Sequence, residues 1–262
     1  MQTPIIVTGA CGRMGRTIAE FVRNDAQCVL AGLMERGEML GSLGTQDCVV
    51  GDTPEKVLSK AKGAVIIDFT APAATLNTAR VAAQLGNPLV IGTTGLDAAQ
   101  KQELAELARK IPLFWAPNMS IGVNVLLKIL PELTRLLGEQ YDVEMVELHH
   151  NKKKDSPSGT ALNIAECLAK AKGWELADAA CYHREGIIGE RPQRQIGVQT
   201  VRGGDVVGVH TVYFMGPGER IEVTHQAHSR ENFAQGAVRA AKWLATQQPG
   251  RMYGMQDILS GC

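Results

Sequence analysis

Side chains suited to proton transfer and anion binding are concentrated in one segment, residues 147–161, which reads E-L-H-H-N-K-K-K-D-S-P-S-G-T-A. His149 and His150 stand out because histidine has an unperturbed pKa of about 6.5 and can transfer protons near neutral pH. The three lysines at 152–154 add fixed positive charge and hydrogen-bond donors, which suit an anionic group or its protonation.

The same segment contains a predicted helix start. Ser158, Gly159 and Thr160 come just before an apolar, helix-like stretch that continues to about residue 172. Hydroxyls and free N–H groups at a helix N-terminus can hold a carboxylate. With the basic residues, this predicts a site for a small acidic molecule, although a solvated lysine loop and an ordinary helix cap would give the same pattern.

A metal site is a weaker interpretation of the paired histidines. They are adjacent instead of spaced i, i+4, and no cysteine cluster accompanies them. We therefore predict no metal. The isolated histidines are expected to have structural or surface roles: His183, His210, His225 and His228.

A second candidate site lies near the N-terminus, where the apolar run 4–8 leads into G-A-C-G-R-M-G at residues 9–15 and then a predicted helix over 13–23. Glycines allow a tight turn and close approach to a pyrophosphate, whose charge the helix N-terminus stabilises. The spacing G-x-x-G-x-x-G places the second glycine one residue later than in G-x-G-x-x-G. Its position between strand and helix still favours a dinucleotide site.

Glu35 follows the second predicted strand, twenty residues after Gly15, where a carboxylate can bind ribose hydroxyls. The adjacent Arg36 can bind a 2′-phosphate. This pair predicts tolerance of both NADH and NADPH. Loops 92–95 and 116–119 follow later strands and are expected at the same sheet edge, where either can border the nicotinamide.

The elements that must position these residues alternate between strand and helix in the first half of the chain. We predict strands at 4–8, 29–34, 64–69, 88–91 and 113–116, and helices at 13–23, 54–60, 74–85 and 97–110. This is an α/β pattern, a Rossmann-like doubly wound parallel sheet. Beyond residue 142, alternating runs at 143–148, 196–201, 206–214 and 221–225, with a helix at 158–172, predict a second α+β domain with a mixed or antiparallel sheet. One more helix is predicted at 233–245, and composition alone does not say on which domain it packs.

Composition narrows the class of protein. The chain has 262 residues, 45% of them hydrophobic, and its 27 basic and 27 acidic residues cancel. A balanced charge favours neither nucleic acid nor an anionic membrane as a partner. No secretory pattern is recognised at the start, and no run approaches the roughly 20 apolar residues that span a bilayer. A cytoplasmic location is expected.

These motifs resemble those of one family. Residues 147–161 are similar to the E-x-H-H-x-x-K-x-D-x-P-S-G-T-A signature of bacterial 4-hydroxy-tetrahydrodipicolinate reductase, also called dihydrodipicolinate reductase. Further segments resemble the same family over nearly the whole chain: G-A-x-G-R-M-G at 9–15, D-F-T at 68–70, G-T-T-G at 92–95, V-R-G-G-D at 201–205 and F-A-Q-G-A at 233–237.

The resemblance implies roles residue by residue. His149 is expected to be the general acid/base and Lys153 the proton donor. The expected substrate ligands are His150, Ser158, Gly159 and Thr160. The expected cofactor contacts are Gly9, Ala10, Cys11, Gly12, Arg13, Met14, Glu35, Arg36, Gly92, Thr93, Thr94, Ala116, Pro117, Asn118 and Met119. Pro117 departs from the small residues that many relatives carry there.

The resemblance also implies an activity and an assembly. The activity is NAD(P)H-dependent reduction of a cyclic dicarboxylate, 4-hydroxy-tetrahydrodipicolinate, with loss of water, in lysine and diaminopimelate biosynthesis. The assembly is a homotetramer, joined through the second domain. The implied domains are 1–120 for the dinucleotide, with the C-terminal segment 231–262 returning to it, and 121–230 for substrate binding and oligomerisation.

Three other functions fit parts of the pattern. A reductase or dehydrogenase of the same architecture could act on another small amino-acid precursor, and would then oxidise no cofactor with the lysine-pathway substrate. A nucleotide-sensing protein would bind NADH without turnover. A metal-dependent hydrolase would lose activity when freed of metal.

Overall fold

The computed structural model describes residues 2–260, so the first residue and the last two of the predicted domain ranges lie outside it. The chain forms two compact units. The first comprises the described residues up to Ile121 together with those from Glu231 onward, and the second is Gly122–Arg230. Each unit is described by itself.

The first unit is built on a seven-stranded parallel sheet in the order β12-β6-β5-β4-β1-β2-β3. The core order 3-2-1-4-5-6 is that of doubly wound dinucleotide-binding folds, which confirms the predicted α/β class. The strands are β1 Thr3–Thr8, β2 Cys28–Met34, β3 Val49–Gly51, β4 Val65–Asp68, β5 Leu89–Ile91, β6 Leu113–Trp115 and β12 Met252–Tyr253.

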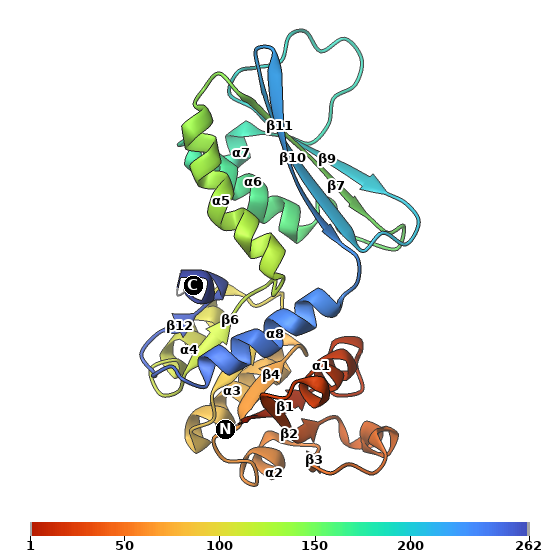
Figure 1. Ribbon diagram of the computed structural model, residues 1–262, viewed down its shortest axis with the longest axis vertical. Helices are drawn as coiled ribbons and strands as arrows, with labels where there is room; N and C mark the ends of the chain where they lie inside the picture. The colour runs from red at the N-terminus through yellow and green to blue at the C-terminus, as the bar shows by residue number, and fades with distance from the viewer. Residues whose placement is uncertain (1, 261–262) are drawn as a thin grey trace. The chain divides into compact units, whose positions relative to one another are not determined.

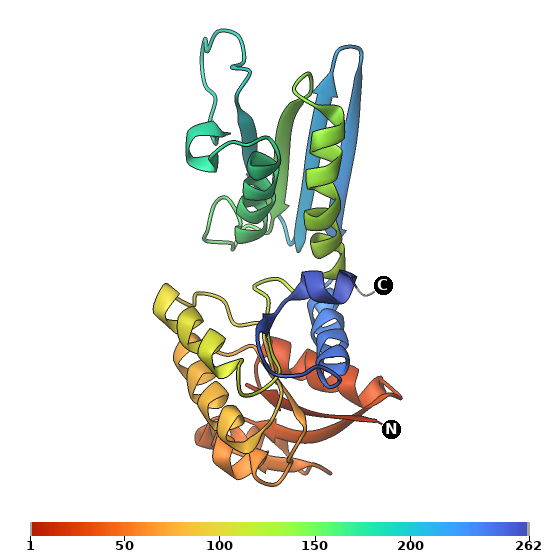
Figure 2. The same ribbon diagram turned by 90° about the vertical axis from the view of Figure 1, so that its left-hand side faces the viewer.

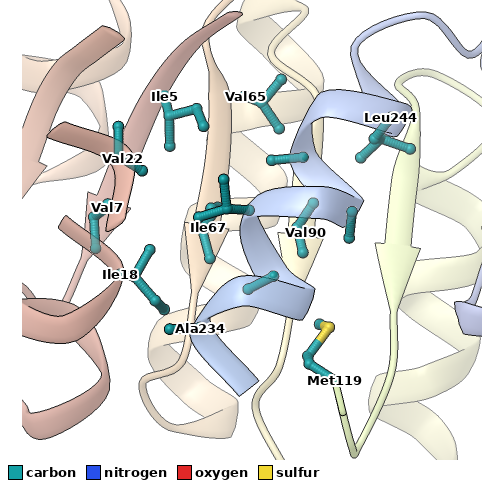
Figure 3. Close-up of a cluster of buried hydrophobic side chains, with 14 of the residues drawn as sticks. Ile5, Val7, Ile18, Val22, Val65, Ile67, Val90, Met119, Ala234 and Leu244 are labelled. Carbon is teal, nitrogen blue, oxygen red and sulfur yellow. The ribbon is translucent and has the colours of Figure 1, made fainter. Parts of the chain in front are cut away.

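Helices cover both faces of this sheet. Its helical segments are α1 Arg13–Asn24, η1 Gly37–Leu43, α2 Pro54–Leu58, α3 Pro72–Leu85, α4 Ala98–Leu107, α8 Glu231–Leu244 and α9 Met255–Ser260. Figure 3 shows α8 packed across β1, β4 and β5, and its Ala234 and Leu244 belong to one buried cluster with the strand residues Val7, Ile67 and Val90. The other face packs against α2, α3 and α4. Strands buried on both faces are expected to be continuously apolar, as β4 is.

Local signals fix several helix starts. Thr53 caps α2 by accepting the Lys56 amide, and Pro54 occupies the first turn. Asp97 and Gln100 form a capping box at α4. The helices predicted in the first half are confirmed to within a few residues, whereas the short strands β3 and β12 and the segment η1 were not predicted.

The second unit has a five-stranded mixed sheet in the order β11-β10-β7-β9-β8. β10 pairs antiparallel with β7 and β11, while β9 pairs parallel with β7 and β8. Its elements are α5 Ile121–Leu137, which begins one residue before the unit, β7 Asp142–His149, α6 Gly159–Ala171, α7 Leu176–Ala179, β8 Ala180–Cys181, β9 Ile196–Arg202, β10 Gly208–Gly216 and β11 Glu219–Ala227.

One face of this sheet carries the unit's core. α5 and α6 lie on the same side of the strands in Figures 1 and 2, and their side chains pack against Met145, Val212 and Phe214. The sequence analysis missed α5, although Leu126 and Leu130 are apolar at helical spacing. Within residues 2–260, no helix has the length and apolar character that crossing a membrane requires.

Candidate active site

His149 is the last residue of β7. The strand alternates buried and half-buried residues, and His149 lies on the helix-covered face with Val143, Met145 and Glu147. Its imidazole is nearly enclosed, since the residue is 9% exposed. A Cβ on Gly208 would lie 3.0 Å from His149 Nε2, so this nitrogen lies against the start of β10.

Glu147 binds the other ring nitrogen of His149. Its Oε2 is 2.6 Å from His149 Nδ1, and the carboxylate is fully buried. Arg202 donates to both carboxylate oxygens at 2.8 Å, and the Ser158 amide donates to Oε1 at 2.9 Å. Burial raises the pKa of Glu147, but the hydrogen bonds from His149, Arg202 and Ser158 outweigh it and hold the pKa well below its usual range.

The loop that follows β7 contains the two other predicted basic residues. His150 is half-buried, and its Nδ1 accepts the Lys152 amide at 3.2 Å. Lys153 Nζ lies 2.9 Å from Asp155 Oδ1. The Lys153 ammonium lowers the pKa of the Asp155 carboxyl, which keeps this carboxylate ionised.

The predicted carboxylate-binding residues lie at the start of α6. Ser158 is the N-cap, and its hydroxyl accepts the Ala161 amide at 3.1 Å. Gly159 is exposed, and no described atom lies within 4 Å of the position a Cβ would take there. Thr160 is half-buried. The structure therefore joins these residues to His149 through Glu147, which accepts the Ser158 amide.

A second histidine lies beside His149. The rings of His149 and His210 are 5.2 Å apart, edge to face, and His210 Nε2 lies 3.1 Å from Ser158 Oγ. Burial lowers the pKa of His210 to about 4, so this ring is neutral at pH 7. No role was predicted from the sequence for Glu147 or Arg202, and only a structural or surface role for His210. Their contacts follow from strand register, which pairs Glu147 with His210 and His149 with Arg202.

The glycine loop of the first unit joins β1 to α1. Gly9 has φ +60, and a Cβ on Gly15 would lie 2.1 Å from the Gly9 carbonyl oxygen, so both positions require glycine. Gly12 is the N-cap of α1, which leaves the first N–H groups of the helix without a capping side chain. Of the other residues predicted to contact the cofactor here, Ala10 is buried, Cys11 and Met14 are half-buried, and Arg13 is exposed.

Glu35 and Arg36 lie at the end of β2 beside this loop. Glu35 Oε2 accepts the Cys11 amide and Oε1 the Arg36 amide, both at 2.9 Å. The Arg36 side chain is 74% exposed and pairs with Glu38 at 3.1 Å. Both residues line a cavity of about 430 Å³ together with Gly9 and Thr70. An acidic and a basic group therefore border the same cavity.

Asp68 connects the loops that follow β4 and β5. Its buried Oδ1 accepts the Thr70, Thr75 and Thr93 hydroxyls at 2.7, 3.0 and 3.2 Å. A Cβ on Gly92 would meet the Phe69 ring at 2.2 Å, so glycine is required for this close packing. Of the predicted loop residues, Gly92 and Thr93 are buried and Thr94 is exposed.

The loop after β6 combines exposed and buried residues. Pro117 is exposed, and Asn118 Oδ1 accepts the Ser120 amide at 2.9 Å. Ala116 and Met119 are buried, and a Cβ on Gly236 of α8 would lie 1.8 Å from the Met119 carbonyl oxygen. The Met119 side chain belongs to the core, so a cofactor would meet this residue through its backbone.

Among residues 2–260, no group of three or more His, Cys, Asp or Glu side chains is arranged to hold a metal ion. The parallel sheet with its glycine loop, and the second unit with its histidine-lysine loop, define a class of two-domain, nicotinamide-dependent oxidoreductases. The family models for the N-terminus and C-terminus of dihydrodipicolinate reductase match residues 3–119 and 122–259. The chain belongs to the dihydrodipicolinate reductase family.

Individual relatives agree over nearly the full length. The chain is 68% identical to the 4-hydroxy-tetrahydrodipicolinate reductase of Nitratidesulfovibrio vulgaris strain Hildenborough, over 98% of this chain and 100% of the relative. It is 65% identical to the enzyme of that name from Desulfovibrio desulfuricans, with the same coverage. The dipicolinate-bound dihydrodipicolinate reductase from Paenisporosarcina sp. TG-14 shares the fold, with a TM-score of 0.79, 24% identity, and coverage of 98% of this chain and 100% of that one.

Proposed function

We propose that this chain reduces 4-hydroxy-tetrahydrodipicolinate to tetrahydrodipicolinate, with oxidation of NADH or NADPH and loss of water, in lysine and diaminopimelate biosynthesis. Family membership and full-length identity to curated reductases support this activity. The observation that carries the proposal is the arrangement of residues 147–161. This segment links an enclosed imidazole, an ammonium group and a helix N-terminus within one unit.

The first unit would hold the dinucleotide. Its close-packed glycine loop fits a pyrophosphate, as does the start of α1, which has no capping side chain. The neighbouring cavity beside Glu35 and Arg36 fits a ribose. Glu35 can accept ribose hydroxyls and the exposed Arg36 can meet a 2′-phosphate, so both cofactors are accepted. When bound, the nicotinamide supplies a hydride. Loops 92–94 and 116–119 would border the nicotinamide.

His149 and Lys153 would manage the proton that balances the hydride. Glu147 accepts from His149 Nδ1, which leaves Nε2 as the nitrogen that exchanges protons. Lys153 Nζ would be the proton donor, and it lies 2.9 Å from the exposed Asp155 carboxylate. A positioned acid of this kind contributes about 10²–10⁴-fold to the rate.

The start of α6 would hold a substrate carboxylate. Ser158 caps the helix, while Gly159 leaves open space above the helix end and Thr160 adds a hydroxyl. The N–H groups of a helix N-terminus, the helix dipole and the neighbouring His150 all favour a negative charge here. A cyclic dicarboxylate bound at the start of α6 would be held by the unit that also contains His149 and Lys153.

The division into units supports separate tasks for them, with residues 1–120 and 231–262 binding the dinucleotide and 121–230 binding substrate. We place the subunit contacts of a homotetramer on the second domain. Val201 and Met215 support this location, because both are large, exposed apolar residues on the sheet face opposite α5 and α6. We assign the protein to the cytoplasm.

A coupled assay tests the activity. Freshly generated 4-hydroxy-tetrahydrodipicolinate is added to the purified protein, and the absorbance of NADH and NADPH is followed in parallel. The expected result is substrate-dependent loss of absorbance with both cofactors. Cofactor binding without any oxidation would refute the proposal and favour a nucleotide-sensing protein.

A further inference from the structure

The buried carboxylate of Glu147 neither transfers a proton nor binds substrate in the function proposed above. We propose that Glu147 is a positioning residue that fixes the tautomer of His149 and joins this imidazole to the N-terminus of α6. The contact geometry stands by itself, and its catalytic consequence rests on the proposed function. Glu147 contacts neither substrate nor cofactor in this assignment, because it acts through His149 and Ser158.

The contact with Glu147 fixes which ring nitrogen of His149 carries the proton. An ionised carboxylate only accepts hydrogen bonds, so the 2.6 Å contact between Glu147 Oε2 and His149 Nδ1 requires the proton on Nδ1. In the neutral ring the lone pair is then on Nε2, the nitrogen that lies against Gly208. One buried oxygen atom thereby decides which nitrogen exchanges a proton.

Several hydrogen-bond donors surround the Glu147 carboxylate and stabilise its negative charge. Arg202 donates one nitrogen to each carboxylate oxygen at 2.8 Å, which is the two-pronged geometry that a guanidinium and a carboxylate favour. The Thr200 hydroxyl adds a longer contact of 3.3 Å to Oε1. These donors keep the carboxylate ionised although no part of it is exposed.

Glu147 also joins two parts of the proposed site, His149 and the start of α6. Oε1 of Glu147 accepts the amide of Ser158, the residue that caps α6, at 2.9 Å. The two oxygens of one side chain therefore fix the imidazole and the helix end on which the substrate carboxylate would bind. Displacement of Glu147 would disturb proton transfer and carboxylate binding together.

The variant Glu147→Gln changes this arrangement without a change of shape. The new amide nitrogen is a donor, so it favours a His149 ring with a bare Nδ1 and a proton on Nε2. The control is Glu144→Gln, in the same strand but on its other face, where Glu144 accepts two bonds from Arg184 at 2.8 and 2.7 Å. Both variants remove a carboxylate that is paired with arginine.

The test reads the His149 tautomer by ¹⁵N NMR of the unliganded protein, with the signal assigned from a His149→Gln spectrum. The parent and Glu144→Gln are expected to carry the neutral-ring proton on Nδ1, and Glu147→Gln on Nε2. In the coupled assay, kcat/KM of Glu147→Gln is expected to fall about 10²-fold, since partners that orient a catalytic imidazole have effects of that order. Glu144→Gln is expected to retain parental kcat/KM.

Three results would overturn the inference: a parent protein with the proton on Nε2, a Gln variant that keeps it on Nδ1, or a Gln variant with parental kcat/KM. The parental tautomer decides the matter even if Glu147→Gln fails to fold. A parent that shows the Nδ1 proton but no turnover would refute the proposed function and leave the tautomer assignment standing.

Discussion

At the scale of single residues, two neighbouring imidazoles have different hydrogen-bond partners. His149 donates to the buried carboxylate of Glu147. His210, with its ring centre 5.2 Å away, is buried and forms a hydrogen bond with the Ser158 hydroxyl. Burial lowers the pKa of His210 to about 4, and the neighbouring His149 also contributes to lowering it. A neutral His210 beside His149 is thus part of the fold at pH 7.

The pH dependence of stability should reflect His210. Its folded pKa of about 4 is below the ordinary histidine value of about 6.5, so the unfolded chain binds the extra proton between these values. The free energy of unfolding should therefore fall as pH drops from about 6.5 to 4, by about 2–4 kcal/mol from this residue. Denaturant unfolding of His210→Gln across this range should show a shallower dependence than the parent.

The exposed loop residue His183 supplies the control, since it lies outside the site. His183→Gln should retain the parental slope between pH 4 and 6.5. A parental slope in His210→Gln would contradict the role given to His210.

At the scale of elements, the start of α6 is the proposed binding site for a substrate carboxylate. Gly159 is the first residue of the helix, and the space above it is open. Alanine is favoured over glycine within a helix by about 1 kcal/mol, so a glycine here is not explained by helix stability. Its value is the room it leaves at the helix end.

Gly159→Ala should separate stability from binding. The melting temperature should stay the same or rise, because the Cβ meets no described atom and the backbone is helical. The KM for substrate should rise about tenfold, because the methyl group occupies the space expected for a carboxylate. Thermal melts and initial rates check both. An unchanged KM would remove the start of α6 from the substrate site.

A matched substitution in the first unit should behave in the opposite way. A Cβ on Gly236 would lie 1.8 Å from the Met119 carbonyl oxygen, so Gly236→Ala should lower the melting temperature.

The sequence predicted the elements that have strong local signals. Sequence patterns revealed the glycine loop, the helices α1 to α4 and five strands of the first unit, namely β1, β2, β4, β5 and β6. The helix α5 was missed because Pro131 interrupts its apolar pattern. Its apolar positions at 123, 126 and 130 were the signal that could have revealed it.

The site was only partly predictable for a different reason. Residues 147–161 are continuous in sequence, so their chemistry could be recognised there. Arg202 and His210 reach the same place only because β9 and β10 flank β7 in one register. No local sequence pattern reveals which strands pair when they are this far apart along the chain.

At the scale of the whole molecule, the second sheet buries one face under helices and exposes apolar side chains on the other. A homotetramer joined through this domain would cover Val201 and Met215. Light scattering coupled to size exclusion should then give about four times the chain mass of 28.2 kDa.

Aspartate at both positions should split this assembly, because unpaired charges are costly in an interface. Val29→Asp replaces an exposed valine of the first unit and should leave the mass unchanged. A parent with the mass of a single chain, or a tetramer that persists in Val201→Asp/Met215→Asp, would contradict this placement of the subunit contacts.

The central claim is that residues 147–161 carry the chemistry of a reductase acting on 4-hydroxy-tetrahydrodipicolinate. Its most direct test compares kcat/KM of the parent with that of His149→Ala/Lys153→Ala in the coupled assay, using the cofactor that the parent prefers. We predict a fall of about 10²–10⁴-fold with cofactor affinity retained, because the double variant lacks both proton carriers. Turnover within about tenfold of the parent would contradict the claim.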